Sequence, residues 1–307
     1  MFATPLDWTK PLGGDNILPK TLFGYDVLEH LGQGAGSNLY AVSDRQTHQI
    51  YALKHVVRVN DKSERFIAQL QAEFDVGRSV SHPALRRSID LKINRTLLRK
   101  TIDAALVLEL FDGEPLEFKP PPTIDDAVEC FIQVGHALAA LHAGGWIHCD
   151  LKPNNLLRSS SGEMKVIDLG QACRTGTIKE RVQGTPDYMA PEQVKRVAVT
   201  PRTDVFNFGA TLYWSLCGKN IPTLYSINRS DNSFLFDARI PSPMDYNALV
   251  PENLSQLVME CVKTVPAKRP DSMAAVTRRL EIIQHLMRHH RSNASDSLDD
   301  SFGDKAI

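Results

Sequence analysis

The sequence has almost no net charge. Thirty-five basic and thirty-six acidic side chains leave a formal net charge of −1 over 307 residues. A chain so balanced presents no bulk field that would draw it to nucleic acid or to an anionic membrane. We therefore expect no nucleic-acid partner, and any phosphate must be recognised by a local site.

Cysteines are few, and no long apolar run is present. The five cysteines are scattered, and no two form the C-x-x-C pair of zinc or redox sites. No window approaches the roughly 18 apolar residues of a membrane span, and the opening MFATPLDWTKPLGGD does not resemble a signal peptide. We expect a cytoplasmic protein that does not associate with membranes.

The length exceeds what one hydrophobic core usually organises, which favours two domains or two lobes. Up to Leu110 the pattern predicts an antiparallel sheet carrying one helix over 62–80. The strands are predicted over residues 25–31, 38–44, 49–56, 87–94 and 103–110. After Gly113 helical periodicity dominates. One helix is expected from the cap Thr123 to Gly144, and another after Ser272.

These patterns predict an α+β chain of four parts. The parts are an N-terminal extension (1–24), a sheet lobe (25–110), a helical lobe (111–291) and a tail (292–307). The tail holds four Asp, one Lys, several Ser and one aromatic residue, so we expect it to be acidic and disordered.

The segment Leu31-Gly32-Gln33-Gly34-Ala35-Gly36-Ser37 lies between two predicted strands. Glycines let a backbone turn sharply and approach a phosphate closely. A strand-loop-strand of this kind can cover the phosphates of a nucleotide. Alone, the pattern fits an ordinary hairpin tip equally well.

Lys54 lies on the third predicted strand, in Tyr51-Ala52-Leu53-Lys54. A lysine there can reach phosphate oxygens, and the small Ala52 leaves room for a flat base. Glu73 on the helix is the candidate carboxylate to orient the ammonium, although a lone helix glutamate is more often solvated.

The most informative stretch is Trp146-Ile147-His148-Cys149-Asp150-Leu151-Lys152-Pro153-Asn154-Asn155, followed by Val166-Ile167-Asp168-Leu169-Gly170. Asn155 and Asp168 follow Asp150 by five and eighteen residues. Such side chains supply a base and oxygen ligands for a hard divalent cation.

From about Tyr25 to Met287 the sequence resembles the eukaryotic-type serine/threonine protein kinases, including bacterial members. The family's motifs occur in order as LGQGAGSNLY, YALK, HCDLKPNN, DLG, GTPDYMAPE, DVFNFG and KRP. The resemblance implies a two-lobed kinase fold, with ATP and Mg²⁺ bound and a protein hydroxyl as acceptor.

The resemblance also implies roles for individual residues. Asp150 would be the catalytic base, Lys152 would lie beside the γ-phosphate, and Asn155 with Asp168 would be the magnesium ligands. Lys54 and Glu73 would form the phosphate-binding pair. The remaining nucleotide contacts would come from Gly32, Gln33, Gly34, Gly36, Ser37, Leu39, Ala52, Leu108, Glu109, Phe111 and Leu157.

Other motif residues are expected to serve the architecture. Glu192 and Arg269 resemble a buried ion pair, and Asp204 resembles the carboxylate that braces the catalytic loop. His148 should pack and hydrogen-bond this loop rather than act as a base. Lys152 and Thr185 favour Ser or Thr over Tyr as acceptor.

The sequence departs from the family at two places that affect regulation and nucleotide binding. Gly36 and Ser37 replace the usual aromatic residue and third glycine, so we expect a more flexible hairpin tip. Cys149 replaces the arginine that receives an activation-loop phosphate, and a neutral thiol cannot pair with that group. We therefore expect activity without phosphorylation of Thr175 or Thr177. The sequence leaves open whether Cys149 is simply buried or has a redox role.

Two other functions are compatible with parts of the pattern. A pseudokinase or nucleotide-binding scaffold would fit the altered glycine hairpin. A small-molecule phosphotransferase would have no need of GTPDYMAPE, which shapes a peptide platform in the family. A regulatory partner protein is possible, and the oligomeric state stays open.

Overall fold

The computed structural model describes residues 18–34, 36–60, 63–222 and 237–303, with side chains up to residue 289. The predicted N-terminal extension therefore lies mostly outside the described residues. The chain divides into two compact units. The first unit contains the chain up to Arg78 together with Arg87–Leu110, and the second contains Ser79–Arg86 and the chain from Phe111 onward.

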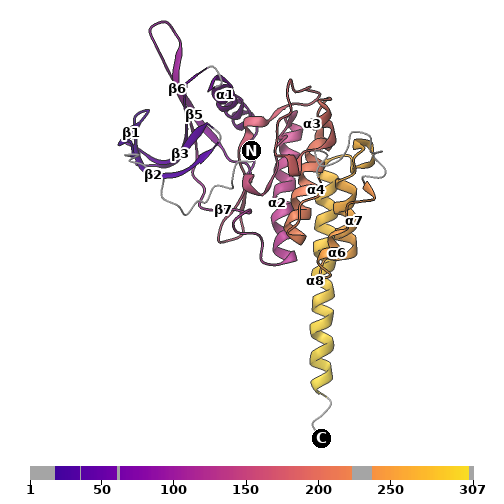
Figure 1. The fold of residues 1–307 in the computed structure, drawn as a ribbon. Coiled ribbons are helices and arrows are strands. Elements are labelled where there is room, and N and C mark those ends of the chain that lie inside the picture. Colours follow the sequence, from indigo (N-terminus) through magenta and orange to yellow (C-terminus); the bar gives the residue numbers. More distant parts are fainter. Residues whose placement is uncertain (1–17, 35, 61–62, 223–236, 304–307) are drawn as a thin grey trace. The chain divides into compact units, whose positions relative to one another are not determined.

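The first unit is a six-stranded antiparallel sheet with one helix (Figure 1). The strand order is β1-β2-β3-β4-β6-β5. Its elements are β1 (Thr21–Leu22), β2 (Tyr25–Gly34), β3 (Ser37–Asp44), β4 (Ile50–Val57), α1 (Glu64–Ser79), β5 (Ser88–Arg95) and β6 (Thr101–Glu109). All the predicted strands of this region are present. β1 was not predicted; it lies in the segment assigned to the extension and pairs with β2.

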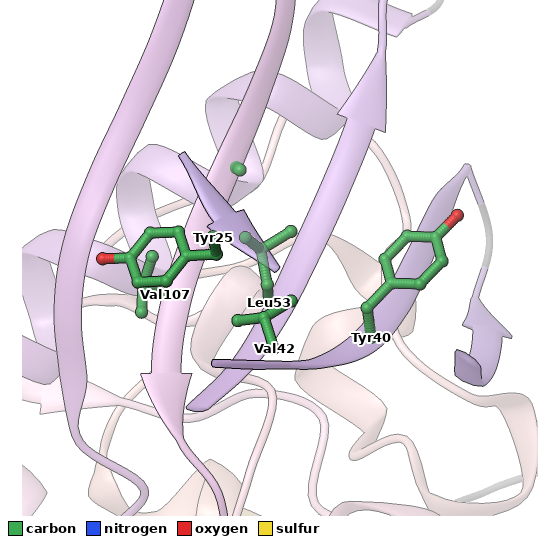
Figure 2. Packing of buried hydrophobic residues seen from close by; sticks show 6 residues of the cluster. Tyr25, Tyr40, Val42, Leu53 and Val107 are labelled. Atoms are coloured by element: carbon green, nitrogen blue, oxygen red, sulfur yellow. The ribbon is translucent and has the colours of Figure 1, made fainter. Parts of the chain in front are cut away.

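Alternation along the strands gives this sheet two apolar faces. One face carries the cluster of Tyr25, Tyr40, Val42, Leu53, Ala105 and Val107 (Figure 2). The opposite face carries Ala52, Leu106 and Leu108, which pack with Leu70 of α1. Because antiparallel partners point to the same face, the pairs Leu39–Lys54 and Ala52–Leu108 place four predicted nucleotide residues on the α1 side.

The segment Ser79–Arg86 belongs to the second unit, whereas the sequence predicts one continuous lobe over 25–110. Backbone hydrogen bonds explain the difference. Val166 N–H donates to the carbonyl of Ala84 at 2.8 Å, and Arg86 N–H donates to the carbonyl of Val166 at 3.1 Å. The segment is thereby joined to strand β10.

The second unit is mainly helical, as the sequence predicts. Its helices are α2 (Ile124–Ala143), α3 (Pro191–Lys195), α4 (Pro201–Cys217), α6 (Pro243–Tyr246), α7 (Glu252–Cys261) and α8 (Met273–Gly303). Its strands are β7 (Glu114–Pro115), β8 (Trp146–Ile147), β9 (Leu156–Arg158), β10 (Met164–Val166) and β11 (Cys173–Arg174). Helices α2, α4 and α8 pack against one another (Figure 1). The expected α+β architecture is confirmed.

The ends of α2 follow the capping signals in the sequence. Thr123 adopts an extended backbone, and its side chain accepts the Asp126 N–H at 3.1 Å. Gly144 ends the helix. This cap satisfies one of the N–H groups that a helix start leaves without an intrahelical partner.

Helix α8 continues through Gly303 and extends beyond its neighbours in the second unit (Figure 1). The structure assigns residues 292–303 to this helix, whereas the sequence predicts a disordered tail from residue 292. Adding a residue to an existing helix forms one hydrogen bond per residue fixed and avoids the costly nucleation step. Within the described residues, no helix combines the length and apolar character that a bilayer span requires.

Glu192 and Arg269 form the buried ion pair expected from the motifs. Arg269 Nη1 and Nη2 donate to the two carboxylate oxygens of Glu192 at 2.7 and 2.9 Å. The Arg269 side chain is fully buried, with 0% exposed. The pair connects α3 to the chain just before α8.

Candidate functional site

In the first unit, Lys54 and Glu73 form a direct ion pair. Lys54 Nζ lies 2.8 Å from Glu73 Oε2, with side chains 22% and 3% exposed. The reading of Glu73 as an ordinary solvated residue is therefore excluded. The Glu73 carbonyl also accepts the Ser88 hydroxyl at 3.2 Å, which attaches α1 to β5. The ammonium thus has a fixed position on the α1 side of the sheet.

The glycine hairpin joins β2 to β3, and Gly34 is paired with Ser37 at its end. Gly36 has φ +87°, and a Cβ there would lie 2.5 Å from the ring of Phe66. Both the backbone conformation and the contact require glycine. The tip of the hairpin therefore packs on α1. The sequence predicted a more flexible tip, but the altered motif gives the tip a packing partner.

In the second unit, Asp150 lies at the centre of a polar cluster. Its Oδ1 accepts the N–H and the hydroxyl of Thr185 at 3.1 and 3.2 Å. Lys152 Nζ lies 3.3 Å from Asp150 Oδ2 and donates to the Thr185 hydroxyl at 2.8 Å. Asn155 Nδ2 donates to the carbonyl of Asp150 at 2.8 Å. The Asp150 side chain is 10% exposed, so it remains within reach of solvent.

The buried carboxylate of Asp204 holds the loop that precedes Asp150. It accepts the N–H groups of His148 and Cys149 at 2.8 and 2.9 Å. His142 Nε2 lies 2.8 Å from the same carboxylate. Burial alone would raise the pKa of Asp204, but the hydrogen bond and charge of His142, with the loop amides, lower it below its usual value. Asp204 therefore braces the loop as an anion.

The loop backbone is fixed in an uncommon conformation. Cys149 has φ +66°, a left-handed value that costs energy for a residue with a Cβ. Its carbonyl accepts Gln193 Nε2 at 2.7 Å, so hydrogen bonds hold both sides of the residue. His148 is fully buried, and its Nδ1 accepts the Asp150 N–H at 3.2 Å. His148 thus has the structural role predicted for it.

A short hairpin brings Asn155 and Asp168 together. Strands β9 and β10 pair antiparallel, with Leu156 opposite Val166. Ile167 N–H donates to the carbonyl of Asn155 at 3.0 Å, which sets the next residue, Asp168, beside the loop. Asp168 has φ +62° and ψ +67°. Two residues distant in sequence are thus adjacent at the end of one hairpin.

The residues at the end of this hairpin fit a magnesium ion. The Asn155 amide nitrogen is occupied by Asp150, so its oxygen is the atom left to face a cation. Asp168 would contribute carboxylate oxygens. In the described part of the chain no three His, Cys, Asp or Glu side chains cluster as a metal site. Mg²⁺ commonly takes only one or two carboxylates and completes its shell with phosphate and water oxygens.

The predicted nucleotide contacts divide between the two units. The residues of the first unit are Gly32, Gln33, Gly34, Gly36, Ser37, Leu39, Ala52, Lys54, Leu108 and Glu109. Phe111 and Leu157 lie in the second unit. Leu157 is on β9 opposite Pro115, and Lys165 Nζ lies 5.7 Å from the centre of the Phe111 ring.

Sequence reasoning missed three residues of the second unit. His142 pairs with Asp204, which holds the loop before Asp150, and Gln193 donates to the Cys149 carbonyl. Neither carries a local signal, because the two partners of each contact are distant in sequence. Cys173 lies with its sulfur 3.6 Å from that of Cys149. Thr185 was noted only for acceptor preference, yet it contacts Asp150 directly.

Comparison with known families identifies the family of this chain. The protein kinase domain matches residues 25–285, most of the chain. The chain belongs to the protein kinase domain family. The fold and the ordered motifs of this kinase domain agree with that membership.

The relatives of this kinase domain include bacterial and eukaryotic enzymes. It is 28% identical over 272 residues to the DNA damage-responsive serine/threonine-protein kinase RqkA of Deinococcus radiodurans, covering 85% of this chain and 40% of that protein. It is 32% identical over 203 residues to human calcium/calmodulin-dependent protein kinase type IV, covering 63% of this chain and 41% of that protein. The kinase domain thus spans about two fifths of the length of these curated relatives.

Proposed function

We propose that this chain is a serine/threonine protein kinase that transfers the γ-phosphate of ATP to protein hydroxyls. The observation that carries the proposal is the cluster around Asp150. A carboxylate, an ammonium group and a hydroxyl converge there on a loop that Asp204 holds rigid. Family membership and relatives named as serine/threonine kinases support the same reaction.

The proposal gives chemical tasks to Asp150 and Lys152 of the cluster and to residues outside it. Asp150 orients the acceptor hydroxyl and receives its proton as the phosphorus–oxygen bond forms. Lys152 neutralises charge that develops on the transferred phosphoryl group, and Lys54, fixed by Glu73, holds the other phosphates. Asn155 and Asp168 would hold Mg²⁺, which would supply further neutralisation of phosphate charge.

The proposal includes activity without a phosphate on Thr175 or Thr177. Backbone hydrogen bonds already hold this segment, because Thr175 N–H donates to the Gly145 carbonyl at 3.1 Å and Val199 N–H donates to the Thr177 carbonyl at 3.0 Å. The Thr185 contacts to Asp150 are formed as well. Cys149, the residue before Asp150, is neutral and buried, so it offers no charge to a phosphate.

The activity is tested with purified chain, γ-labelled ATP, Mg²⁺ and a generic basic protein. Asp168→Asn should remove the signal, because the amide loses the charge that binds the cation. Asp271→Asn is the matched control in the same unit, since its side chain is 86% exposed. It should retain full activity. Equal transfer by the native chain and Asp168→Asn would refute the assignment, and no transfer by any protein would favour a scaffold role.

Independence from loop phosphorylation needs its own test. Phosphatase-treated native chain and the double variant Thr175→Ala, Thr177→Ala should transfer phosphate at the native rate within about twofold. If both treatments abolish transfer while the native chain is active, the independence is refuted and the kinase proposal stands.

A further inference from the structure

Cys149 and Cys173 form a thiol pair inside the second unit. Their sulfurs are 3.6 Å apart, which is van der Waals contact. A disulfide needs about 2.05 Å between sulfurs, so closure requires an approach of about 1.5 Å. Cys173 is on β11, which pairs with β8 so that Cys173 faces Ile147, two residues before Cys149. The two backbones are therefore already in register.

The two thiols differ in environment. Cys149 is 2% exposed and packs with Ile147 and Val199, whereas Cys173 is only partly buried at the edge of that cluster. The hydrogen bond between the two thiols, assisted by the charge of Lys179, lowers the pKa of Cys173 to about 7 against its burial. The same hydrogen bond and deeper burial raise the pKa of Cys149. Cys173 is thus the more nucleophilic member.

We propose that Cys149 and Cys173 are a modification site for hydroperoxides, at which oxidation joins the catalytic loop to β11 through a disulfide. The Cys173 thiolate attacks a peroxide oxygen, an S–O bond forms, the O–O bond breaks and hydroxide leaves. The Cys149 sulfur then attacks the Cys173 sulfenic acid, an S–S bond forms, the S–O bond breaks, and the departing hydroxide takes the Cys149 proton as water. The proton that Cys173 released on ionising converts the first hydroxide to water. In total two thiols lose two electrons, and hydrogen peroxide is reduced to two water molecules.

The disulfide should displace either the loop that carries Asp150 or strand β11. The Cys149 backbone is held by Asp204 and Gln193, and its φ is already left-handed. An approach of about 1.5 Å therefore shifts either this loop or β11, which precedes the segment that carries Thr185. A displacement of about 1 Å at a catalytic group can lower a rate about 100-fold. Oxidation should therefore lower the phosphotransfer rate at least about tenfold, and reduction of the disulfide should restore it. Only this consequence rests on the proposed kinase activity.

The crosslink is tested on the full chain without any activity measurement. The native chain is treated with hydrogen peroxide, free thiols are blocked with N-ethylmaleimide, and proteolytic peptides are analysed by mass spectrometry. We expect a Cys149–Cys173 peptide that has lost two hydrogen atoms and that dithiothreitol separates. Cys130, Cys217 and Cys261 should be recovered as maleimide adducts. Absence of the crosslinked peptide, or its formation with another cysteine, overturns the proposal.

Variants identify the attacking thiol. In Cys149→Ala, a dimedone adduct should form on Cys173, because its sulfenic acid has no resolving partner. Cys173→Ser should form no crosslink and no adduct on Cys149, while Cys217→Ser, another partly buried cysteine of the same unit, should form the crosslink normally. An adduct on Cys149 in Cys173→Ser would overturn the assigned order of attack. The native mapping decides the crosslink even where a variant fails to fold.

Discussion

Removal of Arg269 gives a quantitative test of how the second unit is held together. Besides its bidentate pairing with Glu192, the Arg269 guanidinium donates to backbone carbonyls of Lys263, Arg202 and Thr264, with donor–acceptor distances of 2.7, 2.7 and 3.2 Å. It also lies 4.9 Å from the centre of the Phe206 ring. Arg269→Ala leaves all these acceptors without their donor.

The expected cost follows from burial. Breaking a buried pair by removing one partner leaves an uncompensated charge, which typically costs about 3 to 5 kcal/mol of unfolding free energy. Arg279 and Glu260 form a comparable pair in the same unit, but their side chains are 40% and 44% exposed. Solvent screens such a pair, and its removal should cost about 0 to 1 kcal/mol. Arg279→Ala is therefore the matched control.

Urea unfolding, monitored by tryptophan fluorescence in a Trp8→Phe background, measures the difference. Trp146 and Trp214 then report on the second unit, where both lie. With a urea dependence of ~3 kcal/mol per molar, a cost of about 3 to 5 kcal/mol means that Arg269→Ala should lower the midpoint by about 1 to 1.7 M. Equal midpoint shifts for the two variants would refute the assignment of stability to the buried pair.

Three further predictions test the sites and their supports. Lys54→Met should lower the phosphotransfer rate by about 100-fold or more. The control Lys92→Met changes a half-exposed lysine that is paired with Asp90, and it should stay near the native rate. Equal rates for the two variants would contradict a phosphate role for Lys54. Gly36→Ala should weaken ATP binding about fivefold and should lower the melting temperature more than Gly24→Ala does. Both glycines have φ near +90°, but only at position 36 would an added Cβ collide with Phe66. Equal effects of the two substitutions would contradict the contact. The lowered pKa of Asp204 stabilises the fold above about pH 4, and this stability is lost as the pH falls through the folded pKa. Acid titration followed by circular dichroism should therefore show a steeper loss of structure in the native chain than in Asp204→Asn. Parallel curves would contradict this prediction.

Local periodicity and motif order predict much of the fold. Alternating apolar residues identified the strands of the sheet, and the Thr123 cap identified the start of α2, because these signals act within a few residues. β1 was missed because two residues show no period. The helical course of residues 292–303 was missed because composition reports burial, whereas extension of α8 depends on the helix that precedes it.

The candidate site was predictable only where one stretch carries several members. One loop carries Asp150, Lys152 and Asn155, so their short separation in the sequence predicts that they lie close together. Cys173 contacts Cys149, and His142 contacts Asp204, through tertiary packing that no spacing reveals. Burial of Glu73 likewise depends on how α1 packs on the sheet, which its own sequence does not specify.

The most direct test of the central claim is the phosphotransfer rate of Asp150→Asn, measured with ATP, Mg²⁺ and a basic protein beside the native chain. The amide preserves the side-chain shape but cannot accept the hydroxyl proton, so the rate should fall by about 100-fold or more while ATP affinity and the melting temperature stay close to native values. Transfer at the native rate would contradict the assignment of Asp150 as the catalytic base.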